Sequence, residues 1–419
     1  MNRAIGFLNR FVVPPLTALS ENTYLSAIRA GMVSLVPLTI IGGLFMILCY
    51  FPVGGWDKLV APHLPLLQVP VTATFGLLSI FLCFAVGYHL GKLLKQEAVV
   101  SAGIATAVYL MIQLDLGDGA DSIGFDMNRL GSQGLFTAIL IALVCVRVQK
   151  LLTDQNAVIR LPPSVPPIVY ESFLSLSPLF LLMVLFWMIR FVLGVDINSI
   201  VQTLFQPLVF ALNTLPGILM SVFMITLLWS VGINGDNALD AIIGPVFLKY
   251  LAANVEAMAR GEPLPYITAQ GFVTAFVNVG GTGATLGLAL IMLRSKEPGY
   301  RKVSRVSLPT QVFQINEPIF FGFPIVLNPI LMVPYILSAL SLTAGTYLLM
   351  DWGLINRPFV NVPWTTPPII GHYLVTEGDW RAAVWGVASI GLAMLVYYPF
   401  AKIAERQRLQ AEAAGTAHE

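Results

Sequence analysis

Residues 314–350 read QINEPIFFGFPIVLNPILMVPYILSALSLTAGTYLLM and contain one charged side chain, Glu317. The apolar run at 324–350 exceeds the roughly 20 residues that a helix needs to cross a membrane. The residues before it carry proline and glycine, which interrupt a continuous helix. The stretch therefore predicts a membrane-spanning helix preceded by a broken segment that holds a carboxylate.

The rest of the chain has the composition of a polytopic membrane protein. Hydrophobic residues make up 57% of its 419 residues and charged residues 11%. A soluble domain averages roughly 45–50% apolar and about 25% charged. At about 20 residues per span, the apolar content limits the chain to roughly ten to twelve spans. We therefore expect an all-α polytopic fold.

Several function classes are excluded by the same counts. Lys and Arg number 23 against 22 Asp and Glu, a net charge of +1, so we expect no nucleic-acid partner. Cys49, Cys83 and Cys145 have neither metal nor disulfide spacing. The glycine-rich residues 279–285 lack the G-K-[ST] ending of a phosphate-binding loop. We expect no metal, no cofactor and no nucleotide site.

Basic residues predict the orientation of the chain in the membrane. They flank alternate loops of the first half and follow the last apolar run: Arg3, Arg10, Lys92, Lys95, Arg147, Lys150, Arg160, Lys402, Arg406 and Arg408. Cytoplasmic loops carry an excess of Lys and Arg. We therefore expect both termini to be cytoplasmic and the number of spans to be even, which ten satisfies.

The chain divides into four parts on these patterns. Residues 1–20 have no cleavable signal and gather apolar side chains on one face, which is typical of an interfacial helix. An N-terminal transmembrane half follows at 21–195 and a C-terminal transmembrane half at 196–400. A cytoplasmic tail occupies 401–419.

Glu317 is the first candidate functional residue, because ionisable groups at membrane depth are costly and mark functional sites. Pro318 pushes it away from helical geometry, so its carboxylate lies at a helix break. A carboxylate there can accept hydrogen bonds from sugar hydroxyls and take a proton from one. The alternative is a structural carboxylate bonded to backbone donors at the break.

A second candidate is the turn at 229–237, WSVGINGDN. Its amide and carboxylate side chains, Asn234, Asp236 and Asn237, suit the hydroxyls of a sugar, and Trp229 offers a ring face to pyranose C–H groups. The alternative is a capping turn in which Asp236 or Asn237 starts the next helix.

Two further segments carry candidates with open alternatives. Residues 280–283 (GGTG) either allow close helix packing or line a cavity with backbone. The proline-rich segment at 362–372 places Trp364 and His372 at similar depth. Trp364 is either a ring for the substrate or part of an interfacial aromatic belt, and we interpret His372 as structural.

The densest basic cluster comprises Arg294, Lys296, Arg301, Lys302 and Arg305. It is either an ordinary positive-inside loop or a docking surface for an acidic or phosphorylated cytoplasmic partner.

These motifs resemble the membrane-spanning enzyme IIC subunit of the bacterial phosphoenolpyruvate-dependent sugar phosphotransferase system, lactose/cellobiose/diacetylchitobiose type. The resemblance covers almost the whole chain. Its most specific part is 316–329, NEPIFFGFPIVLNP, supported by 229–235, 280–283 and 364–368.

The resemblance implies ten transmembrane helices with two re-entrant hairpins in the second half. It also implies a homodimer, formed through the N-terminal half, in the bacterial inner membrane among its lipids. The C-terminal half would hold a disaccharide of the β-glucoside or chitobiose class and move between outward and inward positions. The 6-hydroxyl of the sugar would then meet a phosphocysteine on a separate enzyme IIB, which enzyme IIA supplies.

Carried over to this chain, the resemblance assigns the catalytic role to Glu317. The substrate-binding residues would be Trp229, Asn234, Gly281, Thr282, Asn316, Glu317 and Trp364. Enzyme IIB would dock on Arg294, Lys296, Arg301 and Lys302. Family members commonly carry histidine where this chain has Asn234, which can bind a hydroxyl but cannot titrate near neutrality.

Two other function classes remain as alternatives. A proton-coupled secondary sugar symporter would use Glu317 as its proton site and would transport without a phosphorylated partner. A non-transporting membrane sensor would not bind sugar.

Overall fold

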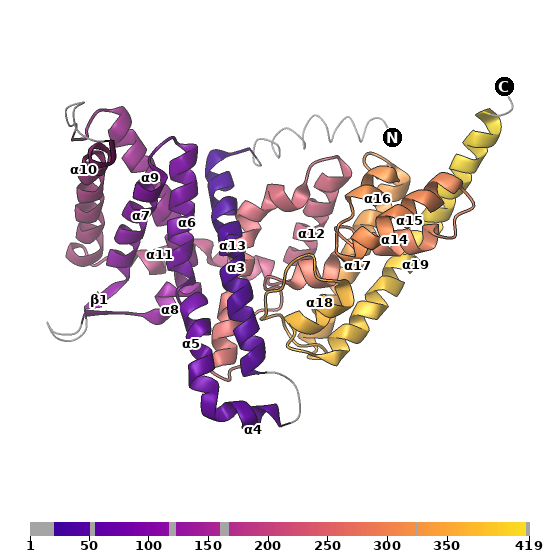
Figure 1. Cartoon of the computed structure of the whole chain (residues 1–419), viewed down its shortest axis with the longest axis horizontal. Coiled ribbons are helices and arrows are strands. Elements are labelled where there is room, and N and C mark those ends of the chain that lie inside the picture. The colour runs from indigo at the N-terminus through magenta and orange to yellow at the C-terminus, as the bar shows by residue number, and fades with distance from the viewer. Residues whose placement is uncertain (1–20, 51–54, 117–122, 160–166, 324, 416–419) are drawn as a thin grey trace.

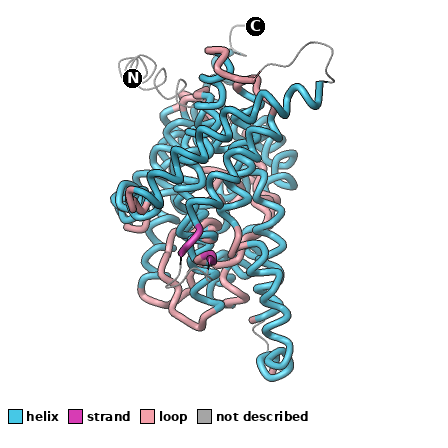
Figure 2. The backbone as a smooth tube through the Cα atoms, turned by 90° about the vertical axis from the view of Figure 1, so that its left-hand side faces the viewer, coloured by secondary structure: helices cyan, strands magenta, loops and turns pink. Residues whose placement is uncertain are grey.

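Helices make up nearly all the regular structure of the computed structural model, which describes residues 21–50, 55–116, 123–159, 167–323 and 325–415. Within these ranges the only sheet is one antiparallel pair, β1 (Leu114–Leu116) with β2 (Ile123–Phe125) (Figure 2). The predicted interfacial helix at 1–20 lies outside the described residues.

The first part of the chain forms a bundle of roughly parallel and antiparallel helices (Figure 1). Its helices are α3 (Thr23–Cys49), α4 (Trp56–Val60), η2 (Ala61–His63), α5 (Leu64–Thr74), α6 (Leu78–Leu93), α7 (Ala98–Gln113), α8 (Met127–Leu130), η3 (Ser132–Gly134), α9 (Leu135–Asp154), α10 (Pro167–Trp187) and η4 (Met188–Val192).

The second part mixes long helices with short ones. Its helices are α11 (Ile197–Leu212), α12 (Leu215–Ser230), α13 (Gly235–Ala259), η5 (Phe272–Val277), α14 (Leu286–Met292), α15 (Pro298–Val312), α16 (Glu317–Gly322), α17 (Pro329–Asp351), α18 (Pro368–Val375) and α19 (Trp380–Gly415). The short segments α14, α16 and α18 lie against the long helices α17 and α19 (Figure 1).

The lengths and apolarity of these helices confirm the predicted all-α polytopic fold. Seven helices of the described chain are long and apolar enough to cross a membrane, or eight if α11 and α12, bent by 82°, count as one broken span. Helix α7 is apolar but shorter. The start of α3 and the end of α19 lie at the same end of the molecule, the upper end in Figure 1.

Small residues allow the helices of the first bundle to pack closely. A Cβ added at Gly91 of α6 would lie 2.7 Å from Ser101 Cβ of α7. Behind this contact a continuous core of buried aliphatic and aromatic side chains includes Leu82, Val86 and Tyr109. The same core takes in Val246 and Tyr250 of α13, so α13 belongs to the packing of both parts of the chain.

Polar contacts also attach α13 to distant segments. Glu256 accepts hydrogen bonds from the backbone N–H and the hydroxyl of Ser132, at 2.9 and 2.8 Å. Asn254, fully buried, donates to the carbonyls of Tyr266 and Pro358 at 2.8 and 2.7 Å and accepts from Tyr266 N at 3.0 Å. Because a buried backbone group without a partner is costly, Asn254 fixes both segments against α13.

Replacing Asn254 with Leu should therefore destabilise the protein by about 2–4 kcal/mol, because three backbone groups lose their partner. The apparent melting temperature in detergent should fall by roughly 5 °C or more. Ser338→Ala is the matched control, because the Ser338 hydroxyl is buried with no hydrogen-bond partner among the described residues. An unchanged melting temperature in Asn254→Leu would contradict this role.

Candidate functional site

Glu317 begins the short helix α16, where the preceding backbone breaks. Gln314 has a left-handed φ of 67°, and Pro318 occupies the first turn. The Glu317 side chain is exposed, and within the described chain it makes no hydrogen bond and no ion pair. A carboxylate in the first turn of a helix is favoured by the helix dipole. The site thus presents a carboxylate that pairs with no other residue in the described part of the chain.

The residues just before Glu317 hold a glycine turn by its backbone. Gln314 Oε1 accepts hydrogen bonds from Gly280 N and Gly281 N at 2.9 and 3.2 Å. Asn316 Nδ2 donates to the Thr282 carbonyl at 2.7 Å. Gly281 has a φ of 101°, and a Cβ there would lie 2.4 Å from Asn316 Cγ. Only glycine fits this position, so the 280–283 segment packs directly on the segment that carries Glu317.

Asp236 joins the second predicted segment to the same turn. Its Oδ2 accepts hydrogen bonds from Trp229 Nε1 at 2.8 Å and from Thr282 Oγ1 at 2.9 Å. The Trp229 ring also meets Phe320 of α16 edge-on, with centroids 5.4 Å apart. The segments that carry Trp229, Gly281, Thr282, Asn316 and Glu317 are therefore brought together, and the role of these residues in substrate binding stays a prediction.

Asn234 lies in the turn between Trp229 and Asp236 and caps α13. Its Oδ1 accepts from Asn237 N at 2.9 Å, so the turn does cap α13, but the capping residue is Asn234 and not Asp236 or Asn237, because the helix already begins at Gly235. The Asn234 side chain is exposed, and its amide nitrogen has no hydrogen-bond partner in the part of the chain that is described. Capping by the oxygen leaves the amide N–H groups available to a ligand. Arg29 of α3 supports the same turn by donating to the Asn237 carbonyl at 2.6 Å.

Trp364 is not joined to this set. Its side chain is 59% exposed, and among the described residues no hydrogen bond or ring contact connects it with Trp229, Asp236 or Glu317. Its role in binding stays a prediction. His372, by contrast, is fully buried, bonds the Pro368 carbonyl through Nδ1 and meets the Phe276 ring at 4.5 Å.

The predicted basic cluster lies on and beside α15. Arg294, Lys296, Arg301 and Lys302 are all exposed, and none of them forms an ion pair with another described residue. Glu297, the acid among them, is buried and caps α15 by accepting from Gly299 N at 2.8 Å and from Tyr300 N. The exposed end of α15 therefore carries an uncompensated positive charge.

Helix α15 packs directly on the helix that carries Glu317. The Tyr300 ring stacks on Phe323 with centroids 4.5 Å apart. A Cβ at Gly322, the last residue of α16, would lie 2.5 Å from Val303 Cγ1. A partner bound to the basic surface would consequently lie on a helix in contact with α16.

Asp236 and Gln314 belong to the site, although the sequence does not predict either of them among the substrate-binding residues. Asp236 lies in the predicted turn beside Asn234, and Gln314 lies three residues before Glu317. Both act on backbone or side chains far away in sequence, and only a three-dimensional structure shows such partners.

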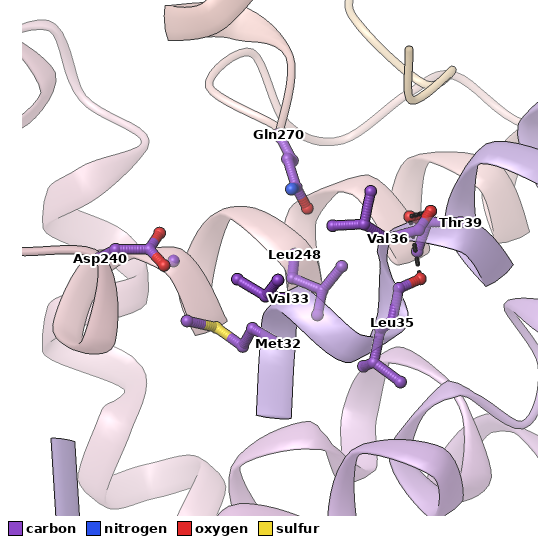
Figure 3. Close-up of a pocket in the computed structure, with 9 residues that line it drawn as sticks. Met32, Val33, Leu35, Val36, Thr39, Asp240, Leu248 and Gln270 are labelled. Carbon is purple, nitrogen blue, oxygen red and sulfur yellow. Dashed lines mark hydrogen bonds between the residues drawn. The ribbon is translucent and has the colours of Figure 1, made fainter. Parts of the chain in front are cut away.

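A small cavity of about 60 Å³ lies between α3 and α13 (Figure 3), and Glu317 is not among the residues that line it. Asp240 and Gln270 reach toward it from different elements, and Met32 and Leu248 line it (Figure 3). Ligand sites usually measure roughly 300–1,000 Å³. This cavity is too small for a sugar and has the size of a water site.

Comparison with known proteins places the chain in a family. A family model described as "Phosphotransferase system, EIIC" matches residues 29–339. The chain is 34% identical to the cellobiose-specific EIIC component of Geobacillus stearothermophilus, over 99% of this chain and 97% of that protein. It is 33% identical to the lichenan permease IIC component of Bacillus subtilis, over 98% and 96% of the two chains.

A solved structure agrees. The transporter ChbC, the IIC component of the N,N'-diacetylchitobiose-specific phosphotransferase system, superimposes with a TM-score of 0.90 at 31% identity. The match covers 97% of this chain and 99% of ChbC. The EIIC components of this system take a sugar substrate and work with an EIIB component. The chain therefore belongs to the EIIC family of the phosphotransferase system, the membrane-spanning sugar permeases.

Proposed function

We propose that this permease imports a disaccharide of the β-glucoside or chitobiose class and presents its 6-hydroxyl to a phosphocysteine on a separate EIIB chain. The cellobiose-specific relative and the chitobiose-specific ChbC support this substrate class. The observation that carries the proposal is the exposed Glu317 carboxylate. It pairs with no other described residue and lies between Asn316, which contacts Thr282, and Phe320, which contacts Trp229.

The site suits a sugar because it combines an apolar ring with unsatisfied polar groups. Trp229 is held in a fixed orientation by Asp236 and Phe320, so its ring can cover one face of a pyranose. The amide of Asn234 and the carboxylate of Glu317 are exposed, and each can form a hydrogen bond with a hydroxyl group of the sugar. Thr282 and Asn316 are buried: the Thr282 hydroxyl donates to Asp236, and the Asn316 amide donates to the Thr282 carbonyl. Trp364 is proposed as a second ring contact.

Glu317 would act on the 6-hydroxyl as acceptor and base. As the phosphoryl group moves, the S–P bond to the EIIB cysteine breaks and an O–P bond to the sugar forms. The hydroxyl proton passes to the Glu317 carboxylate and then to water, and the cysteine leaves as a thiolate. General base catalysis of this kind contributes about 10²–10⁴-fold. Glu317 is therefore proposed as the catalytic residue.

EIIB, phosphorylated by an upstream EIIA, would dock on Arg294, Lys296, Arg301 and Lys302. A phosphorylated partner is attracted to clustered, uncompensated Lys and Arg side chains. Because α15 contacts α16, docking there would bring the phosphocysteine near Glu317. The positive-inside pattern puts this end of the molecule in the cytoplasm, together with both termini.

The remaining features of the proposal concern assembly and movement. We place the protein in the bacterial inner membrane as a homodimer formed through 21–195, with 196–400 carrying the sugar between outward and inward positions. The broken segments α14, α16 and α18 gather against α17 and α19, which suits a substrate-carrying unit (Figure 1). Membership of the EIIC family does not favour a proton-coupled symporter, which would transport down a pH gradient without EIIB.

Glu317→Gln should reduce phosphorylation of cellobiose or chitobiose at least about 100-fold, because an amide cannot accept the proton. Sugar affinity, followed by tryptophan fluorescence, should change by less than about threefold, because an amide still bonds a hydroxyl. Phosphorylation is measured with purified phospho-EIIB and labelled sugar. Glu262→Gln, at an exposed carboxylate elsewhere, is the control. Wild-type turnover in Glu317→Gln would remove Glu317 from the mechanism.

Asp236→Ala should weaken sugar binding about tenfold, because Trp229 and Thr282 lose the acceptor that orients them. Asp236→Asn retains an oxygen at that place and should bind within about threefold of wild type. Binding is read by fluorescence titration, and melting temperature checks folding. Equal affinity in the Ala and wild-type proteins would show that Asp236 does not position the site.

Replacing Arg301 and Lys302 together with Glu should weaken phosphotransfer at least about tenfold when EIIB is limiting, because charge reversal opposes docking. Saturating EIIB should restore most of the rate, and sugar affinity should stay unchanged. The control is Lys92→Glu with Lys95→Glu, two exposed cations at the end of α6. Full activity at limiting EIIB would rule out this surface as the docking site.

A further inference from the structure

A long groove runs along the outer face between α14 and α19, away from Glu317. It consists of two adjoining cavities of about 520 and 660 Å³, which share Ile291, Met394 and Tyr398. The two helices pack tightly behind it, since a Cβ at Gly287 would lie 2.8 Å from the backbone of Ala393. The groove is therefore a fixed surface feature of the packed helix pair.

The two ends of the groove differ in chemistry. The first cavity is lined by the cations Arg294 and Lys402 and by Tyr398, together with apolar side chains. The lining of the second carries no charge: Ile291, Trp385, Ala388, Gly391, Leu392, Met394, Leu395 and Tyr398. The groove is thus cationic at one end and apolar along the rest. It is complementary to an anionic amphiphile, which has a negatively charged head and an apolar chain.

The part of the groove between Lys402 and Gly391 matches one membrane leaflet. These two residues are eleven residues apart on α19, which corresponds to about 16 Å along a helix, and the apolar lining continues beyond Gly391 to Trp385. Half of a hydrocarbon core of about 30 Å is about 15 Å. The basic end lies toward the end of α19 where α15 is also found (Figure 1), the side that the Lys and Arg pattern assigns to the cytoplasm.

Gly391 makes room in the middle of the groove. A Cβ added there would meet no other atom within 4 Å. A side chain at this position would therefore start in open space and extend into the groove that Gly391 lines.

The charges at the basic end leave one cation without an acid. Lys402 forms an ion pair with Glu405 at 2.7 Å, and Glu405 also accepts from Ser295 Oγ at 2.7 Å and Lys296 N at 2.5 Å. Arg294 is exposed, and no carboxylate of the described chain pairs with it. The end of the groove therefore carries a surplus of one positive charge, which a phosphodiester balances.

We propose that this groove is a binding site for an anionic phospholipid of the cytoplasmic leaflet. Its phosphate lies on Arg294, which also belongs to the proposed EIIB docking surface, with Lys402 at its side. One acyl chain follows α19 past Leu395 and Gly391. Basic pockets between membrane helices on the cytoplasmic side are suited to acidic headgroups. Tyr398 lies at the level where headgroup and chain meet, as interfacial aromatic residues do.

A second groove supplies an internal comparison. It lies between α12 and α17, measures about 500 Å³, and is lined without any charge: Pro216, Leu219, Met220, Phe223, Leu337, Leu340, Ser341 and Ala344. Lipid chains in such a groove have no headgroup partner, so binding there should not distinguish anionic from zwitterionic lipid.

The test is native mass spectrometry of the purified full-length protein titrated with phosphatidylglycerol or with phosphatidylethanolamine of the same acyl chains. Wild type should retain phosphatidylglycerol at least about fivefold better. Arg294→Gln should lose this preference, whereas Arg294→Lys should keep it. Gly391→Phe and, as a milder variant, Gly391→Leu should lower the binding of both lipids.

Two controls separate this site from general lipid contact. Ala344→Phe adds the same bulk in the α12–α17 groove, and Lys92→Gln removes a cation at the same membrane side in the first bundle. Neither should change the preference for phosphatidylglycerol. Equal retention of the two lipids by wild type, or equal loss in Gly391→Phe and Ala344→Phe, would overturn the proposal. So would a loss of dimer in Gly391→Phe with unchanged lipid binding, which would make the groove an interface between copies.

Discussion

The structure of the second half depends on satisfying the backbone groups that interrupted helices leave without partners. At membrane depth water cannot supply those hydrogen bonds, so protein groups must do so. Gln314 bonds two N–H groups of the glycine turn, and Asn316 bonds its Thr282 carbonyl. Asp236 then ties Thr282 to Trp229. Gln314 and Asn316 thus satisfy backbone groups of the glycine turn, whereas Asp236 links two side chains. Together they fix three distant segments at one place.

This arrangement leaves the Glu317 carboxylate without a hydrogen-bond or ion-pair partner among the described residues. Its neighbours are already bonded to one another, so its carboxylate is available to a ligand and its position is set by the helix it begins. The basic surface of α15 lies on the adjoining helix through the Tyr300–Phe323 stack. A substrate group bound by Glu317 and a phosphorylated partner bound to α15 would therefore lie on two neighbouring helices that are packed against each other.

The all-α fold and most of the candidate site could be predicted from local features of the sequence. Long apolar runs predict membrane-spanning helices, and a single acid beside Pro318 predicts a helix break with a functional carboxylate. Long-range partners could not be predicted, because nothing local couples Asp236 to Thr282, 46 residues away, or Asn254 to the Pro358 carbonyl. The polar composition of residues 401–419 predicts a cytoplasmic tail but does not show that α19 continues as a helix to Gly415. Trp364 belongs to the motif at 364–368, but its contacts depend on the position of the whole proline-rich segment at 362–372.

The most direct test of the account is a structure of the full-length protein with cellobiose or chitobiose bound. The account predicts the sugar O6 at about 3 Å from a Glu317 carboxylate oxygen, with a pyranose ring against Trp229. A sugar bound elsewhere, with the Glu317 carboxylate bonded to protein groups and closed off from any opening, would contradict it.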